Sequence, residues 1–201
     1  MCCMEGMKEF SDNHFDLALV DPPYGINASE MTMGSGKNKK YTKGKKWDST
    51  PPDKKYFDEL FRISKNQIIF GGNYFELPIS RGWIFWDKGI NGDSSFADGE
   101  LLWTSFDQVL RKASIRYKGF LGADSVRIHI CQKPIQIYKW ILKRHATPDM
   151  KIIDTHVGSG SSIIAFNDFG CDWIGFEIDK DYFEAASKRI AQHKAQQRLA
   201  L

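Results

Sequence analysis

Short apolar runs that end at turn residues recur along the chain, and they predict buried strands. The first run, Phe15–Val20, reads Phe-Asp-Leu-Ala-Leu-Val and fits a strand buried on both faces, as in a parallel sheet. It stops at Asp21-Pro22-Pro23-Tyr24-Gly25, because two prolines cannot continue a central strand. Similar runs predict further strands at residues 67–70, 83–86, 100–106, 151–153 and 173–178.

Segments with apolar residues at helical spacing alternate with these strands. Tyr56, Leu60 and Ile63 share one face of a helix predicted at residues 54–64. Further helices are predicted at residues 134–144, 161–169 and 181–199. This alternation predicts an α/β fold with a mostly parallel sheet and helices on both faces. Since neither an internal repeat nor a domain boundary is visible, we expect a single domain over residues 1–201.

The composition is that of an ordinary globular protein, and it excludes several other classes. Hydrophobic residues make up 42% and charged residues 26% of the 201 residues, which is enough for one core and unlike a disordered chain. The cysteines Cys2, Cys3, Cys131 and Cys171 show no metal-ligand spacing and no disulfide framework. No apolar run could span a bilayer, and the N-terminus lacks a signal peptide. We therefore expect a cytoplasmic protein without a membrane partner.

The Asp21-Pro22-Pro23-Tyr24 turn carries the sharpest chemical signal. It is predicted to lie beyond the carboxyl end of a strand, where open α/β sheets bind their ligands. The exocyclic amine of adenine or cytosine is a poor nucleophile, because its lone pair is delocalised into the ring. Asp21 and the Pro22 carbonyl offer two acceptors for the amine hydrogens, the prolines stiffen the turn, and Tyr24 offers a flat face for the base. The alternative is a plain proline turn, with Asp21 as a cap and Tyr24 in the core.

A second candidate site lies between a predicted strand and a predicted helix near the C-terminus. It reads Asp154-Thr155-His156-Val157-Gly158-Ser159-Gly160-Ser161-Ser162, and its two glycines allow the backbone to approach a ligand closely. Glu177 ends the next strand, where an acid can bind ribose hydroxyls. Asp154 would repel a phosphate but could pair with the ammonium group of S-adenosylmethionine. A plain strand-to-helix turn is one alternative. A nicotinamide-dependent oxidoreductase is another, disfavoured by the missing third glycine.

These two motifs, in this order, resemble the β class of amino-methyltransferases, the DNA methylase N-4/N-6 family. The resemblance covers nearly the whole chain and implies a Rossmann-like methyltransferase fold with circularly permuted motif order, in which the catalytic turn comes first. Residues 21–24 look like the catalytic motif, with the Asp that the family usually has for adenine targets. Residues 127–134 look like its His-Pro-Thr-Gln-Lys-Pro motif beside the cofactor pocket. Residues 154–160 resemble its cofactor loop, and Glu177 resembles its ribose acid.

The motifs and the resemblance together imply a set of cofactor contacts. We expect S-adenosylmethionine to be bound by Asn73, His129, Lys133, Asp154, Gly158, Ser159, Gly160, Ser161 and Glu177. For His129 and Lys133 the alternative is a surface position, and Asn73 could simply cap a turn. At the N-terminus, Cys2 stands where the family has an acid near the adenine of the cofactor.

The formal net charge of +3 is too small to argue for DNA binding, so the argument rests on where the basic residues cluster. Two basic segments are candidates. Residues 27–47 show no periodicity and are expected to be a mobile loop that folds over phosphates, or else simply a solvated loop. Residues 107–128 lie where the family often recognises its target, and they are basic and irregular from Arg111 onward. The DNA-binding residues expected from both segments are Lys37, Lys39, Lys40, Lys43, Lys45, Lys46, Arg111, Arg116 and Lys118.

The sequence therefore predicts an S-adenosylmethionine-dependent methyltransferase that modifies the N6 amine of a flipped adenine in double-stranded DNA. The base must be flipped, because its amine is hydrogen-bonded in the duplex. Neither a metal nor a covalent nucleophile is needed, since the sulfonium makes the methyl group reactive and positioning supplies much of the rate. Alternatives are N4-cytosine methylation, RNA as the substrate, and a non-catalytic DNA-binding relic. A homodimer and a bacterial or phage source are further expectations from the family.

Overall fold

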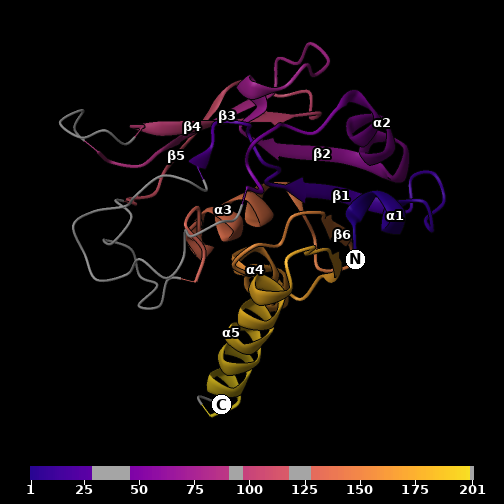
Figure 1. Cartoon of the computed structure of the whole chain (residues 1–201). Helices are drawn as coiled ribbons and strands as arrows, with labels where there is room; N and C mark the ends of the chain where they lie inside the picture. Colours follow the sequence, from indigo (N-terminus) through magenta and orange to yellow (C-terminus); the bar gives the residue numbers. More distant parts are fainter. Residues whose placement is uncertain (29–45, 91–96, 118–127, 200–201) are drawn as a thin grey trace.

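A computed structural model of the chain describes residues 1–28, 46–90, 97–117 and 128–199 (Figure 1). The strands are β1 (Phe15–Val20), β2 (Ser64–Phe70), β3 (Trp83–Asp87), β4 (Gly99–Thr104), β5 (Arg111–Ser114), β6 (Lys151–Asp154) and β7 (Asp172–Gly175). The helices are α1 (Cys3–Met7), α2 (Lys54–Ile63), the 3₁₀ helix η3 (Gly72–Tyr74), α3 (Ile135–His145), α4 (Ser161–Phe169) and α5 (Lys180–Leu199). Strands and helices alternate through much of the described chain, as the sequence predicts.

The strands form one sheet, whose order is β5-β3-β4-β2-β1-β6-β7. β1 pairs in parallel with β2 and with β6, β6 pairs in parallel with β7, and β3 pairs in parallel with β5. β4 is antiparallel to both of its neighbours, β2 and β3. The sheet is therefore mostly parallel, and the carboxyl ends of β1 and β6 lie side by side.

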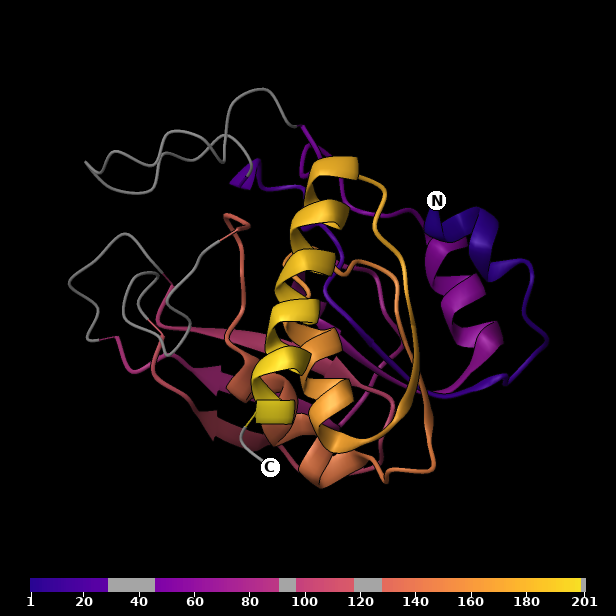
Figure 2. The same ribbon diagram turned by 90° about the horizontal axis from the view of Figure 1, so that it is seen from below.

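Helices cover both faces of this sheet. Leu17 and Leu19 of β1 pack into one core with buried residues of α3 and α4. Ala18 and Val20 point to the other face and pack into a second core with α2 and Met7 of α1. Because successive strand residues point to opposite faces, an unbroken apolar run such as β1 can supply both cores. Figure 2 shows α1 and α2 on the side away from α3, α4 and α5.

The helix α5 projects from the sheet toward the C-terminus (Figure 1) and is the longest helix of the described residues. None of the helices in the described residues is long and apolar enough to cross a membrane. At the start of α5, Tyr182 and Ala186 are buried. Gly160, which precedes α4, packs against Ala186 and Ile190, where an added Cβ would lie 3.3 and 3.1 Å from side-chain atoms. The helix α5 thereby supports the loop after β6.

The structure differs from the sequence prediction at a few elements. The segment from Arg111 was expected to be irregular, whereas Arg111–Ser114 form the edge strand β5. Only Ala113 of this strand is buried, so it shows no apolar run, and pairing with β3 makes it a strand. The strand β7 ends at Gly175 rather than at residue 178. The helix α1 is too short for apolar periodicity to reveal it.

Candidate active site

The two candidate motifs open into one cavity at the carboxyl ends of neighbouring strands. Asp21 follows β1 directly, Asp154 ends β6, and these two strands pair in parallel. The turn after β1 and residues Gly158 and Ser159 of the loop after β6 line a cavity of about 740 Å³. Cavities that hold small-molecule ligands typically measure roughly 300–1,000 Å³. The structure thus brings together two motifs that lie far apart in the sequence.

Tyr24 is fixed in orientation by its contacts within and beyond the catalytic turn. Its hydroxyl donates a hydrogen bond of 2.8 Å to Asp21. Its ring stacks on Tyr74 of η3, with centroids 4.8 Å apart and an interplanar angle of 11°. Gly71 has a φ of 65° and lies against the same ring, where an added Cβ would be only 2.3 Å from Tyr24. The rings of Tyr24 and Tyr74 both line the cavity, together with Asp21, Pro22 and Pro23.

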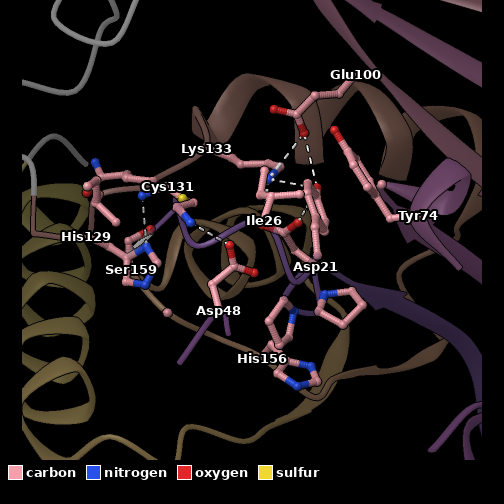
Figure 3. Close-up of a pocket in the computed structure, with 18 of the residues that line it drawn as sticks. Asp21, Ile26, Asp48, Tyr74, Glu100, His129, Cys131, Lys133, His156 and Ser159 are labelled. Atoms are coloured by element: carbon pink, nitrogen blue, oxygen red, sulfur yellow. Dashed lines mark hydrogen bonds and ion pairs between the residues drawn. The ribbon is translucent and has the colours of Figure 1, made fainter. Parts of the chain in front are cut away.

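A charge-balanced cluster surrounds the Asp21 carboxylate (Figure 3). The Lys133 Nζ lies 2.7 Å from Asp21 Oδ2 and 3.3 Å from Glu100 Oε2. It also donates to the Tyr24 hydroxyl at 3.3 Å. The Lys88 Nζ pairs with the other Glu100 oxygen at 2.8 Å. The side chain of Lys133 is 6% exposed and that of Asp21 is 18% exposed, so this cluster is largely shielded from water.

Burial and neighbouring charges set the ionisation of this cluster. Burial raises the pKa of Asp21, Lys133 opposes that shift, and Glu100 adds to it. Burial alone would raise the pKa of Glu100, but Lys133 and Lys88 outweigh it and hold that pKa below its usual value. Burial alone would lower the pKa of Lys133, but Asp21 and Glu100 reverse the effect and raise it. Lys133 is therefore charged at neutral pH, and of the two carboxylates in the cluster Asp21 is the one whose pKa is raised.

The loop after β6 presents backbone groups to the cavity, and Glu177, which follows β7, presents a carboxylate. The Gly158 N–H donates to Glu177 at 2.8 Å, and the Asp179 N–H donates to the other Glu177 oxygen at 2.8 Å. Gly158 has a φ of 52°, a backbone conformation that favours glycine. Glu177 and Ser159 line the cavity with them. An ionised carboxylate accepts about four hydrogen bonds, so Glu177 is fixed in place and still has lone pairs for a ligand.

Three members of the predicted cofactor set lie behind this loop instead of on the cavity wall. Asp154 is 1% exposed and accepts hydrogen bonds from the His156 N–H at 2.9 Å and the Ser162 hydroxyl at 2.5 Å. Gly160 packs against α5, and Ser161 is buried. Burial raises the pKa of Asp154 to about 7. These residues shape the loop, and the contact of Asp154 with the ammonium group of a cofactor stays a prediction.

Asn73, His129 and Lys133 all line the cavity, and their contact with the cofactor stays a prediction. The His129 ring meets Tyr182 edge-on at 4.4 Å and Trp47 at 4.9 Å. His129 therefore joins α5 to the segment that returns to the site at residue 46. Asn73 is exposed in η3, whereas Lys133 reaches the catalytic turn.

Asp48 anchors the chain that follows the catalytic turn. It is 2% exposed, and its carboxylate accepts hydrogen bonds from the N–H groups of Gly25 at 2.9 Å and Ala28 at 2.8 Å. The Asn27 N–H donates to the Asp48 carbonyl at 3.0 Å. The two ends of the segment predicted as a basic loop are therefore held together at the cavity.

Sequence reasoning did not identify Glu100, Lys88 and Tyr74 as site residues. Glu100 lies at the start of β4 and Lys88 directly follows β3. Since β4 runs antiparallel, its first residues lie at the same end of the sheet as the last residues of β3. A charged residue at a strand end is the available signal, but it identifies the site only once the strand direction is known. Tyr74 follows the glycines that end β2, and its partner Tyr24 is distant in sequence.

Most of the predicted DNA-binding residues lie outside the described residues: Lys37, Lys39, Lys40, Lys43, Lys45 and Lys118. The other three, Lys46, Arg111 and Arg116, are described, and all are exposed. None of these three lines the cavity. They are therefore placed for contacts outside it, with Lys46 beside the Asp48 anchor.

Comparisons with known proteins agree with the geometry of the site. The DNA methylase family model for N6 and N4 methylases matches residues 36–188. A curated relative, the type II methyltransferase M.HpaI of Haemophilus parainfluenzae, is 23% identical over 93% of this chain and 71% of its own length.

Solved DNA methyltransferases share the Rossmann-like fold that the sequence predicts. The crystal structure of M1.HpyAVI with S-adenosylmethionine has a TM-score of 0.61 at 17% identity, covering 94% of this chain and 96% of that one. A Thermus thermophilus protein complexed with S-adenosyl-L-methionine has a TM-score of 0.55 at 15% identity, covering 96% and 93%. The cytosine-N4-specific PvuII DNA methyltransferase has a TM-score of 0.55 at 12% identity, covering 93% and 86%. Because the family model matches most of its length, the chain belongs to the DNA methylase N6/N4 family.

Proposed function

We propose that this methylase transfers a methyl group from S-adenosylmethionine to the N6 amine of an adenine flipped out of double-stranded DNA. One observation carries the proposal: the Asp21 turn and the Gly158 loop face the same cavity. Membership of the DNA methylase family supports methyl transfer to DNA. The choice of adenine is the finer part of the proposal and rests on the identity of residue 21.

S-adenosylmethionine fits the residues that line the cavity. M1.HpyAVI and the Thermus thermophilus protein are both described in complex with it. Glu177 would accept the ribose hydroxyls, because each of its oxygens uses one lone pair on a backbone N–H and keeps another. The backbone at Gly158 and the side chains of Asn73 and His129 would line the remaining wall. Bound there, the cofactor would supply a methyl group already activated by its sulfonium.

The catalytic turn would hold the base and its amine. Tyr24 offers its ring to the base, and stacking of this kind is worth roughly 1–3 kcal/mol. The Asp21 carboxylate and the Pro22 carbonyl would accept the two amine hydrogens and direct the nitrogen lone pair toward the methyl group. The positive charge that develops on the nitrogen is stabilised by the Asp21 carboxylate. The proton leaves after the transfer, so a strong general base is unnecessary.

N4-cytosine methylation is the second candidate, because the fold is compatible with it. The cytosine-N4-specific PvuII enzyme covers the chain with the same fold, so the architecture alone does not choose the base. Residue 21 argues for adenine, because an Asp at this position is the form that resembles adenine methylases, and a Ser would resemble the cytosine enzymes. Both bases present an amine to the same two acceptors.

The decisive experiment is product analysis of unmethylated DNA treated with the purified protein and isotope-labelled S-adenosylmethionine. After nuclease digestion, mass spectrometry of the nucleosides should show labelled N6-methyladenine. Labelled N4-methylcytosine would instead establish the second candidate. Label found in RNA and not in DNA would show that the substrate is RNA. Cofactor binding by calorimetry without any labelled product would indicate a non-catalytic relic and overturn the proposal.

Substitution of Asp21 gives a matched test of the site. Asp21→Asn should reduce methyl transfer about 100-fold or more, because the neutral amide stabilises the developing charge far less. Cofactor affinity in calorimetry should change little. Asp58→Asn, which removes an exposed carboxylate paired with Lys54 on α2, is the control. Equal activity of the two variants would rule out Asp21 as the catalytic carboxylate.

A further inference from the structure

We propose that Lys133 is a positioning residue that keeps the Asp21 carboxylate ionised and oriented for the target amine, and that Glu100 sets how strongly it does so. The inference rests on the proposed function, because it concerns the carboxylate assigned to the amine. It reassigns Lys133, which the sequence places among the cofactor contacts. It also gives a role to Glu100, which the sequence does not single out.

The contacts of the Lys133 ammonium group carry the first step. A lysine ammonium has three N–H donors, and three oxygens lie around this one. They belong to Asp21 at 2.7 Å, Glu100 at 3.3 Å and the Tyr24 hydroxyl at 3.3 Å (Figure 3). All three N–H donors therefore have an acceptor within the catalytic cluster. A further contact to the carboxylate of a bound cofactor would have to displace one of these partners.

The orientation of Asp21 follows from two different donors. Lys133 approaches Oδ2, while the Tyr24 hydroxyl donates to Oδ1 at 2.8 Å. Each oxygen is thereby fixed, and each keeps a lone pair. An amine hydrogen can then be accepted without either partner being lost. A carboxylate free to rotate would have to be ordered by the base itself.

Ionisation is the second step, because only the charged form of Asp21 is an acceptor through both oxygens. Burial disfavours that form, and the ammonium of Lys133 offsets the penalty. This benefit has a competing cost, since a cation beside the reacting amine opposes the positive charge that develops there. Glu100 and Lys88 reduce the cost, because the cluster pairs two carboxylates with two ammonium groups.

Glu100 acts on Asp21 in the opposite direction from Lys133. Its carboxylate repels the charge on Asp21 and so raises the pKa of that group. It also shares the ammonium of Lys133, which would otherwise pair with Asp21 alone. Removing Lys133 and removing Glu100 should therefore move the ionisation of Asp21 in opposite directions. A merely structural role for both residues predicts no such reversal.

The four substitutions leave the other titratable groups around Asp21 in place. Tyr24 contacts Asp21 and has its pKa raised well above its usual value by burial and by the nearby carboxylates, so it stays neutral. Burial raises the pKa of Cys131 to about 12, so this thiol also stays neutral. Asp154, at the end of β6, has its pKa raised to about 7 by burial and interacts electrostatically with Asp21. The buried Tyr56 and Tyr138 also sense Asp21 and stay neutral.

The test measures the pH dependence of kcat for methyl transfer in four variants of the full chain. Lys133→Met removes the charge at similar length, and Lys133→Arg restores a cation. Glu100→Gln removes the opposing carboxylate. Lys139→Met is the matched control, because Lys139 of α3 forms an ion pair with Asp168 of α4 and neither residue lines the cavity. Thermal unfolding of each variant identifies any loss of folding.

In Lys133→Met we expect the acid limb of the kcat–pH profile to move to higher pH by about one unit or more. At a pH on that limb, this shift is about a tenfold loss of activity. Lys133→Arg should recover much of the loss. Glu100→Gln should move the limb to lower pH, and Lys139→Met should match the unmodified protein. Unchanged limbs in both Lys133→Met and Glu100→Gln, or shifts in the same direction, would overturn the inference. If Lys133→Met does not fold, Lys133→Arg and Glu100→Gln still test the inference.

A second readout separates this inference from the proposed function. The ¹³C resonance of the Asp21 carboxyl, assigned with Asp21→Asn, reports ionisation whether or not methyl transfer occurs. Opposite shifts of this titration in Lys133→Met and Glu100→Gln support the control of Asp21 by Lys133, even if no DNA is methylated. A protein that methylates DNA, but whose Asp21 titration is the same in both variants, keeps its function and overturns the role of Lys133.

Discussion

Gly71 is as important to the catalytic turn as the residues that bear its chemistry. Its positive φ of 65° turns the chain at the end of β2, and its missing side chain makes room for the Tyr24 ring. The ring can therefore lie against Gly71 while it stacks on Tyr74, with its hydroxyl on Asp21. A residue without functional groups thus determines where the Tyr24 ring lies.

Substitution of this glycine should disturb both folding and catalysis. Gly71→Ala places a methyl group 2.3 Å from Tyr24 in a backbone region that alanine rarely adopts, so we expect a loss of about 1–3 kcal/mol in unfolding free energy. Methyl transfer should fall more than cofactor affinity. Gly170→Ala is the control, because its φ is 87° but an added Cβ meets nothing within 4 Å. Equal effects of the two variants on the kcat of methyl transfer would contradict the role of Gly71.

Asp154, at the end of β6, and His156, in the loop that follows, make opposite contributions to stability as pH changes. Burial raises the pKa of Asp154 to about 7, so its stabilising contribution is present at low pH and is lost as pH rises from about 4 to 7. Burial lowers the pKa of His156 to about 4, so its contribution is present at high pH and is lost as pH falls from about 6.5 to 4. The two slopes of stability against pH therefore partly cancel in the unmodified protein.

Single substitutions should expose each slope. Asp154→Asn leaves the histidine contribution, so stability should fall more steeply as pH decreases from 7 to 4. His156→Gln leaves the aspartate contribution, and stability should fall more steeply as pH rises over the same range. Each pKa unit corresponds to about 1.4 kcal/mol. Urea unfolding at intervals of half a pH unit measures the free energy of unfolding against pH. Parallel curves of this free energy for the two variants would refute the prediction.

At the scale of elements, the site depends on the segment 46–48 being tied to the turn after β1. Asp48 accepts two backbone hydrogen bonds from that turn and is almost fully buried. Asp48→Ala should cost about 2–4 kcal/mol in unfolding free energy, because buried N–H groups lose charge-assisted bonds. It should also raise the KM for DNA, since both anchored ends, at Ala28 and at Asp48, border the cavity.

A second aspartate provides the control for this prediction. Asp53 caps α2 by accepting a hydrogen bond from the Tyr56 N–H at 3.2 Å, away from the catalytic turn. Asp53→Ala should cost about 1 kcal/mol and leave the KM for DNA unchanged. If Asp48→Ala alters stability but not the KM, then the anchor supports the fold without shaping the DNA site.

At the scale of the whole molecule, DNA affinity should come from charges placed outside the cavity. Lys46, Arg111 and Arg116 are exposed and lie among the predicted basic segments. Their joint substitution by Gln should reduce the slope of log affinity against log salt by about 0.9 for each phosphate that the protein no longer neutralises. A control with the same change of net charge replaces Lys8, Lys55 and Lys143, which are exposed elsewhere. Equal slopes would show that Lys46, Arg111 and Arg116 do not bind phosphates.

The sequence predicts the elements and the position of the reactive turn because both are local properties. An apolar run such as Phe15–Val20 must be buried on both faces whatever its neighbours are, and two prolines must end it. The helix predicted at residues 161–169 is found as Ser161–Phe169. Each motif directly follows a predicted strand, which indicates that both lie at the carboxyl ends of parallel strands, and in the structure they share one cavity.

Only the tertiary structure decides what depends on distance across the sheet. The pairing of Lys133 with Asp21 spans 112 positions in the sequence, and its strength comes from burial that no local pattern reports. Glu100 reaches the site because β4 runs antiparallel, and β5 is a strand because β3 lies beside it. Asp154 carries a motif signal and yet lies behind its loop. Local residue patterns fix which segments are buried, whereas the packing of those segments fixes which charges meet.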